Sequence, residues 1–217
     1  MNESFDNIRN GYAEMFRKHG VSSDAMYMPK GRHEIRYRPL LDHLFRNPDS
    51  TVLDYGCGLG YLLEDILESG IQCDYQGVDF VAEFINSCRS RLGAHGRFDI
   101  IDPKAPLSGT YDFVFASGVF NLATSSDQYT SLTYVKERIS ELFNACKILL
   151  IVDFLSPHVD FSQDGAQHVD YREIVDWFVP KLTRRWMMRH DLLPYEYTLI
   201  LYRNDEITRP ENIFESI

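Results

Sequence analysis

Three glycines at alternate positions follow a short apolar run, and this pattern constrains the fold more than any other stretch of the chain. The run covers residues 52–55, the glycines are Gly56, Gly58 and Gly60, and a segment with apolar residues at helical spacing follows. A buried strand that turns tightly into a helix has this pattern. Glycine suits such a turn because it adopts backbone angles that a β-carbon forbids and lets a ligand approach the main chain closely. The stretch therefore predicts a nucleotide-binding turn.

Two acids accompany the glycines. Asp54 lies two residues before the first glycine, and Asp79 ends a second predicted strand nineteen residues after Gly60. A carboxylate at the end of the second strand can accept hydrogen bonds from the ribose hydroxyls of a nucleotide. The spacing G-x-G-x-G differs from the G-x-G-x-x-G of dinucleotide-binding folds, which opposes an NAD-dependent oxidoreductase. The glycines and acids together resemble the class I methyltransferases that use S-adenosylmethionine (SAM), with E/D-x-G-x-G-x-G at the first strand.

This resemblance covers roughly residues 50–203 and implies SAM as the cofactor. It implies a cation before the first strand for the methionyl carboxylate, although a plain surface arginine is the alternative there. It also implies an acid beside the adenine amino group after the third strand, where Pro103 removes the next backbone donor. The expected cofactor-binding residues are Arg36, Asp54, Gly56, Cys57, Gly58, Gly60, Tyr61, Asp79, Phe80, Asp102 and Ser117.

Length and composition predict a single domain in the cytoplasm, as a monomer or homodimer. The chain has 217 residues, of which 44% are hydrophobic, enough for one well-filled core. It has no run of eighteen apolar residues, and its start lacks the basic and apolar regions of a signal peptide. The four cysteines are scattered singly, which is typical of reduced thiols. Because the net charge is −10, we expect neither a nucleic-acid partner nor a membrane partner.

The order of the predicted elements indicates a Rossmann-like α/β fold. Apolar runs predict strands at 52–55, 75–79, 98–101, 111–116 and 148–152, separated by segments with helical spacing. The last two predicted strands, near 184–190 and 195–202, are joined by only a few residues and must pair antiparallel. We expect a seven-stranded sheet of order 3-2-1-4-5-7-6, with strand 7 antiparallel and helices on both faces.

The first part of the chain is expected to form a helical cap. Residues 3–19 predict one helix, and residues 32–46 predict another that begins near Pro39 or kinks there. Between them, Met26, Tyr27 and Met28 lie in an aperiodic loop, where they either plug the edge of the core or line a ligand pocket. We divide the chain into a cap at 1–48, a SAM-dependent methyltransferase domain at 49–203 and a C-terminal tail at 204–217.

The acceptor of the methyl group should bind at the carboxyl ends of strands four and five, because ligands of parallel α/β sheets bind at that edge. Residues 117–121 follow the fourth strand, and an acid ends the fifth. The loop at 155–169 is long enough to be a lid or a substrate wall. Helix capping and core packing are the alternatives for the two candidates after this loop. The expected substrate-binding residues are Tyr27, Asn121, Asp153, His168 and Tyr171.

Methyl transfer from SAM is an in-line displacement at an activated carbon, so the protein mainly has to align the reactants. A base is needed only when the acceptor atom is protonated at neutral pH. We assign this role to His190, which ends a predicted strand at the ligand edge beside Asp191; a hydrogen-bonded structural histidine is the alternative. We expect no metal, because the acids and histidines at 153–168 have no recognisable metal spacing.

Short motifs narrow the resemblance to a bacterial group of small methyltransferases that are often assumed to modify small molecules. These are A-S-G-V-F-N at 116–121, D-F-L-S at 153–156 and R-H-D at 189–191. The expected function is SAM-dependent methyl transfer to an O, N or C nucleophile of a small molecule. One alternative is methylation of RNA or protein, which would need a basic surface or a docking module. The other is a non-catalytic, SAM-binding regulatory protein.

Overall fold

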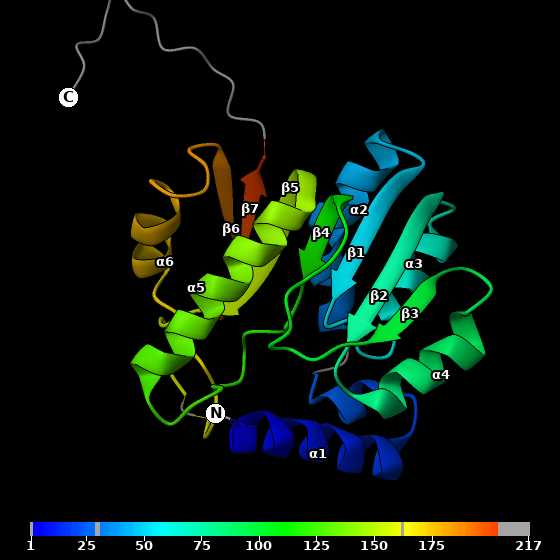
Figure 1. The fold of residues 1–217 in the computed structure, drawn as a ribbon, viewed down its shortest axis with the longest axis horizontal. Helices are drawn as coiled ribbons and strands as arrows, with labels where there is room; N and C mark the ends of the chain where they lie inside the picture. Colours follow the sequence, from blue (N-terminus) through cyan, green and yellow to red (C-terminus); the bar gives the residue numbers. More distant parts are fainter. Residues whose placement is uncertain (1, 29–30, 162, 204–217) are drawn as a thin grey trace, which may run out of the picture.

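A seven-stranded sheet forms the centre of the protein, and helices cover both of its faces (Figure 1). The computed structural model describes residues 2–28, 31–161 and 163–203, so the tail predicted at 204–217 lies outside the described residues. The helices are α1 (Asn2–His19), the short 3-10 helix η1 (Ser23–Met26), α2 (Arg32–Arg46), α3 (Tyr61–Glu68), α4 (Ala82–Leu92), α5 (Gln128–Ala145) and α6 (Tyr171–Phe178). The strands are β1 (Ser50–Tyr55), β2 (Cys73–Asp79), β3 (Arg97–Ile100), β4 (Tyr111–Ala116), β5 (Cys146–Leu155), β6 (Trp186–Leu193) and β7 (Glu196–Tyr202).

The strand order is β3-β2-β1-β4-β5-β7-β6, which confirms the predicted topology. The first five strands pair in parallel, and β7 pairs antiparallel with both β5 and β6. Asp54 in β1 lies opposite Gly77 in β2 and Phe115 in β4. Asp153 in β5 lies opposite Thr198 in β7. The short hairpin between β6 and β7 forces the reversal, because a few residues can join only antiparallel neighbours.

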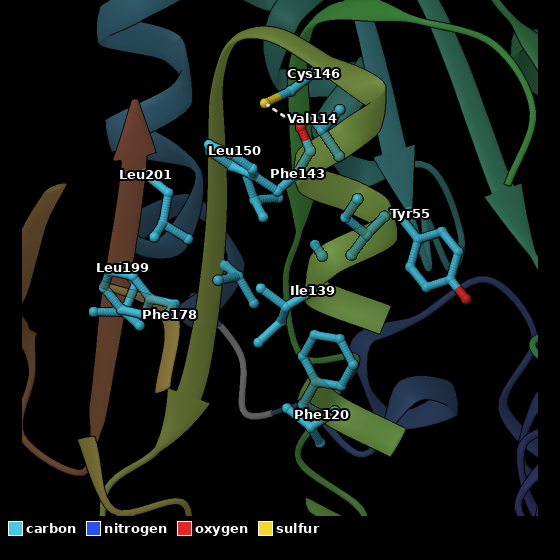
Figure 2. Packing of buried hydrophobic residues seen from close by; sticks show 14 of the residues in the cluster. Tyr55, Val114, Phe120, Ile139, Phe143, Cys146, Leu150, Phe178, Leu199 and Leu201 are labelled. Carbon is cyan, nitrogen blue, oxygen red and sulfur yellow. Dashed lines mark hydrogen bonds between the residues drawn. The ribbon is translucent and has the colours of Figure 1, made fainter. Parts of the chain in front are cut away.

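Two hydrophobic cores hold the helices against the sheet. On one face, α5 and α6 bury residues such as Ile139 and Phe178 against the sheet, and Figure 2 shows Ile139 between α5 and β5. On the other face, α2, α3 and α4 bury residues such as Leu40, Ile66 and Ile85. Strands that are covered on both faces read as continuous apolar runs, which explains why the central strands were recognisable in the sequence.

Several boundaries differ from the prediction. β5 extends to Leu155 and β6 to Leu193, so Asp153 and His190 lie inside strands instead of ending them. β5 continues because β7 pairs with it through Leu155, and β6 continues because β7 pairs with it at residues 186–189 and again at Leu193, with an irregularity between. Helix α2 begins at Arg32 and contains Pro39, so it does not begin at the proline. These differences shift candidate residues by a few positions relative to the edge of the sheet.

Helix α1 lies across the carboxyl ends of the central strands, below the arrowheads in Figure 1. It is held there by aromatic contacts: the ring centroids of Phe16 and Phe84 are 5.8 Å apart, and those of Phe5 and Phe80 are 6.4 Å apart. The first segment of the chain therefore covers the edge of the sheet where ligands of this fold class bind. No helix of the described residues is long and apolar enough to cross a membrane.

Candidate functional site

The three glycines between β1 and α3 all have left-handed backbone angles. Their φ values are 78° at Gly56, 53° at Gly58 and 78° at Gly60, a region that residues with a β-carbon rarely adopt. The amides of Gly56 and Cys57 donate hydrogen bonds of 2.8 and 3.0 Å to the carbonyl oxygen of Val78. These bonds hold the turn against the end of β2, where Asp79 follows.

Asp79 connects the end of β2 to the glycine turn. Its carboxylate accepts one hydrogen bond of 3.0 Å from the amide of Gly58 and another of 2.8 Å from the amide of Val81. A carboxylate has about four acceptor positions, so it can accept from further donors beyond these backbone amides. Burial raises the pKa of Asp79 to about 6, although the backbone donors oppose this shift. The side chain is thus a buried acceptor beside the turn.

Asp54, the acid of the glycine motif, is turned into the sheet. It is buried, and one oxygen accepts a hydrogen bond of 2.6 Å from the hydroxyl of Tyr75 on β2. Burial raises its pKa to about 7, while the tyrosine bond lowers it. The thiol of Cys57 is buried nearby, and burial raises the pKa of that thiol as well. Both side chains therefore support the turn from inside.

A cavity of about 490 Å³ lies next to the end of β2. Phe5 and Arg9 of α1, Phe80 after β2 and residues 100–104 line this cavity. The exposed carboxylate of Asp102 lies at the wall and accepts a hydrogen bond of 2.9 Å from the amide of Lys104. Aromatic walls with a carboxylate at one side fit a flat ring that carries an amino group, as adenine does. The predicted residues Phe80 and Asp102 thus line one cavity.

Comparison with known proteins agrees with this arrangement. The methyltransferase domain family matches residues 53–143, from the glycine turn into α5. The curated protein "Putative methyltransferase Rv1506c" of Mycobacterium tuberculosis is 24% identical over 153 residues, which are 70% of this chain and 92% of that protein. The family match, the curated relative and the solved structures together support a class I, SAM-dependent methyltransferase.

Solved structures of other methyltransferases have the same fold. Magnesium protoporphyrin IX methyltransferase from Synechocystis, with bound S-adenosylhomocysteine (SAH), has a TM-score of 0.64 and 16% identity, and covers 90% of this chain and 94% of its own. N-methyltransferase NodS from Bradyrhizobium japonicum, also with SAH, has a TM-score of 0.62 and 15% identity, and covers 91% of this chain and 100% of its own. The sheet order of this methyltransferase agrees with these structures.

Arg36 of the methyltransferase is a buried ion-pair residue, so the interpretation as a surface arginine is wrong. Its Nε and Nη2 donate to the two carboxylate oxygens of Glu196 at 2.6 and 2.7 Å. Arg32 donates a third hydrogen bond, of 3.2 Å, to the same carboxylate. The remaining Nη1 of Arg36 lies 3.4 Å from the place that a β-carbon on Gly118 would take. Glu196 therefore aims Arg36 at the loop after β4.

Asp153 holds the loop after β4 in place. Its Oδ2 accepts a hydrogen bond of 2.5 Å from the hydroxyl of Ser117, and its Oδ1 accepts one of 2.7 Å from the amide of Gly118. Burial raises the pKa of Asp153, and the charge of Arg36 acts in the opposite direction. The predicted residues Ser117, Asp153 and Arg36 are thus brought together. Because both of its oxygens are engaged, Asp153 positions the loop instead of forming an open wall.

The segments that carry Asn121 and His168 are joined near the end of β5. The carbonyl oxygen of Asn121 accepts a hydrogen bond of 2.9 Å from the amide of Gln167, and His168 pairs with Leu155 in a short parallel bridge. The Nδ1 atom of His168 lies 2.7 Å from the carbonyl oxygen of Ser156. A carbonyl oxygen only accepts, so Nδ1 carries the proton and the neutral ring has its lone pair on Nε2. The sequence placed His168 here but could not assign this tautomer.

His190 lacks the partner that motivated its assignment as the base. It is exposed on β6 at the edge of the sheet, where its ring lies 6.4 Å from that of Tyr197. The carboxylate of Asp191 instead accepts two hydrogen bonds of 2.7 Å from the guanidinium of Arg189. The ion pair forms because arginine presents two parallel donors to a carboxylate. Asp191, whose place beside His190 in the sequence supported that assignment, is thus paired with Arg189.

Three predicted tyrosines make ring contacts in the described structure. Tyr61 begins α3 and stacks on His33, with the ring centroids 5.0 Å apart. Tyr171 begins α6 and lies edge-on to Tyr197 at 6.1 Å. Tyr27 is 56% exposed, and its ring lies 5.5 Å from that of Tyr12 on α1. Tyr27 directly follows η1, the short helix that carries Met26.

Two side chains that the candidate set omitted cover the glycine turn itself. A β-carbon at Gly56 would lie 2.5 Å from Cγ2 of Val119, and a β-carbon at Gly58 would lie 2.5 Å from Sδ of Met26. The amide of Leu59 donates to the same sulfur at 3.4 Å. Sequence reasoning named Met26 only as a plug or a pocket residue, because a segment without periodicity does not show which way a side chain faces.

The histidines and acids at 153–168 do not gather around a common centre. No group of three or more His, Cys, Asp or Glu side chains within residues 2–28, 31–161 and 163–203 is arranged to hold a metal ion. Asp153 and His168 are instead engaged with protein atoms, as described above.

Proposed function

We propose that this methyltransferase transfers the methyl group of SAM to an oxygen, nitrogen or carbon atom of a small molecule. The observation that carries the cofactor half of this proposal is the Asp79 carboxylate, buried against the amide of Gly58. Its remaining acceptor capacity suits ribose hydroxyls, and the glycine turn provides backbone without side chains where the cofactor must approach. The residues present therefore fit SAM.

We assign each part of SAM to a different set of residues. Asp79 accepts the ribose hydroxyls, while Phe80 and Asp102 bind the adenine in the cavity beside them. Arg36 attracts the methionyl carboxylate through Nη1, because Glu196 already occupies its other donors. In this proposal residues 1–48 act as a cap over a methyltransferase domain at 49–203, with α1 closing the cofactor side.

SAM supplies an activated methyl group, so the chain mainly aligns the acceptor with it. Well-aligned reactions gain about 7 to 11 kcal/mol over free encounter, which is enough to make positioning the main contribution. The Asp153 contacts to Ser117 and Gly118 fix the loop at the end of β4 for this purpose. Asn121, on the same loop, contributes a buried Oδ1 without a hydrogen-bond partner in the described residues, which suits an acceptor that donates a hydrogen bond.

His168 is the proposed base when the acceptor atom carries a proton. Its Nδ1 proton is held by the carbonyl oxygen of Ser156, which leaves the Nε2 lone pair to receive a proton. The same geometry is typical of catalytic histidines that are oriented by a second group. His190 remains the rival assignment, but nothing in the described residues holds its ring in a comparable way.

A small-molecule acceptor is supported by charge. The net charge of −10 repels the phosphate backbone of RNA, so an RNA substrate would have to overcome unfavourable long-range electrostatics. The name of the Synechocystis neighbour, magnesium protoporphyrin IX methyltransferase, shows that this fold can serve a small acceptor. We extend that substrate class to this chain as part of the proposal.

The test is conversion of SAM to SAH by the purified protein. Metabolite, RNA and protein fractions of a cell extract are supplied separately, and each is compared with a reaction without extract. Turnover that depends on the metabolite fraction supports the proposal. Turnover that depends on RNA or protein contradicts the small-molecule acceptor. Tight SAM binding without turnover in any fraction favours the non-catalytic alternative.

A further inference from the structure

We propose that Met26 is a gating residue of the cofactor site: its thioether covers the glycine turn and is displaced when SAM binds. This inference rests on the proposed function, since it takes SAM as the ligand of the turn. It goes further because it makes the chain itself a competitor for its own cofactor site. The competing group comes from η1, more than thirty residues before the turn.

The first observation is the space at Gly58. A β-carbon there would lie 2.5 Å from Sδ of Met26, closer than real β-carbons come to other atoms. The second glycine of a nucleotide-binding turn is the residue that allows a ligand to approach the backbone. The thioether therefore occupies the space that the missing side chain leaves for a ligand.

The second observation is the amide of Leu59, the residue after Gly58. It donates to the sulfur of Met26 at 3.4 Å. A thioether is only a weak acceptor, so this bond satisfies the amide poorly. A ligand with oxygen or charged groups would be a better partner, which makes the contact with Met26 easy to replace.

The third observation concerns the freedom of Met26 to leave. Its side chain is half-buried and unbranched, and methionine adapts to several shapes through its rotatable bonds. Glycines at positions 20 and 31, both with positive φ and with open space where a β-carbon would point, flank the segment that carries it. Met26 is one of the partly buried side chains at the edge of the small cluster around Phe84, so its withdrawal exchanges that contact for a contact with the ligand.

Competition of this kind lowers the apparent affinity for SAM. The apparent dissociation constant equals the intrinsic constant divided by the fraction of molecules in which the site is open. If about one molecule in ten has Met26 displaced, removal of the thioether improves the affinity about tenfold, which corresponds to about 1.4 kcal/mol. An increase in SAM affinity would distinguish a gate from an ordinary contact residue, because truncating a contact residue weakens binding.

The experiment measures SAH affinity by titration calorimetry for the wild-type protein, Met26→Ala, Met26→Leu and Met15→Ala. Met15 is a half-buried methionine on α1 and serves as the matched control. We expect tighter binding for Met26→Ala, near wild-type affinity for Met26→Leu because the bulk is kept, and no change for Met15→Ala. Unchanged or weaker binding in Met26→Ala overturns the gate. Absence of SAH binding in both the wild type and Met26→Ala contradicts the proposed cofactor and the gate with it.

A second measurement follows the methionine directly. In protein labelled with 13C at the methionine methyl groups, Met26→Leu assigns one signal. We expect that signal to shift most on addition of SAH, while those of Met187 and Met188 on β6 stay in place. A Met26 signal that does not respond to saturating SAH contradicts displacement, whatever the affinity of the variants.

Discussion

Arg36 and Glu196 are 160 residues apart in the chain and form a buried bidentate ion pair at the carboxyl edge of the sheet, with contacts of 2.6 and 2.7 Å. The pair links α2 to the start of β7 and so joins the first part of the chain to the last strand. Less than one tenth of the surface of each side chain is exposed to solvent. A buried charge that loses its partner is strongly destabilising, so this pair is a sensitive point of the fold.

Replacing Glu196 by alanine is expected to lower the free energy of unfolding by about 3 to 5 kcal/mol, because it leaves the charge of Arg36 buried without its hydrogen-bonded partner. Urea denaturation of the wild type and the variant measures this change. Glu173→Ala is the control, because Glu173 pairs with Lys136 at the surface and such pairs contribute about 1 kcal/mol or less. Equal losses in the two variants would contradict the importance of burial.

Asp79→Asn is expected to weaken SAM binding at least about tenfold, because hydrogen bonds to a charged acceptor contribute about 1.5 to 3 kcal/mol each. The pKa of Asp79 is about 6, so in the wild type the affinity should fall as the pH drops below about 6 and the carboxylate is protonated. Titration calorimetry at several pH values checks both points. A variant with wild-type affinity at pH 8 would show that the ribose lies elsewhere.

Asp54→Asn is expected to stabilise the protein at neutral pH. The pKa of Asp54 is raised to about 7 by burial, so the folded state binds a proton that the unfolded state has released between about pH 4 and pH 7. The contribution of Asp54 to the free energy of unfolding of the wild type is therefore present at low pH. It is lost as the pH rises, by about 1.4 kcal/mol for each pH unit in that window.

The asparagine variant avoids this loss, because its side-chain oxygen can still accept the hydrogen bond from Tyr75 without becoming charged. Unfolding curves at pH 4.5 and pH 7.5 should show a larger difference between variant and wild type at the higher pH. The same difference at both values would mean that Asp54 does not titrate in this window.

His168→Gln is expected to reduce turnover by a factor of about 10² to 10⁴ for an acceptor whose atom must lose a proton, since this is the usual contribution of a positioned base. SAM affinity should not change. The measurement is the pH dependence of kcat with the acceptor identified by the turnover screen, and His95→Gln, an exposed histidine after α4, is the control. If His190→Gln removes the pH dependence while His168→Gln keeps it, the assignment of the base is reversed.

The elements around the glycine turn were predictable because their signals are local. A glycine is needed wherever φ is positive and space is short, so Gly56, Gly58 and Gly60 predict their own conformation. The buried parallel strands are visible in the sequence as apolar runs. The short connection between β6 and β7 predicts the antiparallel hairpin. Asp79, the last residue of β2, lies at a distance from the glycine turn that the lengths of α3 and β2 determine.

The partners of the polar side chains were not predictable in the same way. Nothing near Arg36 in the sequence points to Glu196, and nothing near Asp153 points to Ser117, because each pair forms only when distant strands reach the same edge. His190 and Asp191 show the converse, since neighbours in the sequence of a strand point to opposite faces and need not interact.

The sequence by itself therefore determined the sheet order, the glycine turn and the position of Asp79, because periodicity, turn angles and connection lengths act over short stretches of chain. Only the tertiary structure decided that Glu196 holds Arg36, that His168 has its lone pair on Nε2 and that Met26 covers Gly58. Hydrogen bonds and steric contacts act over a few ångströms, so the direction of a side chain depends on which distant segments the packed core brings to it.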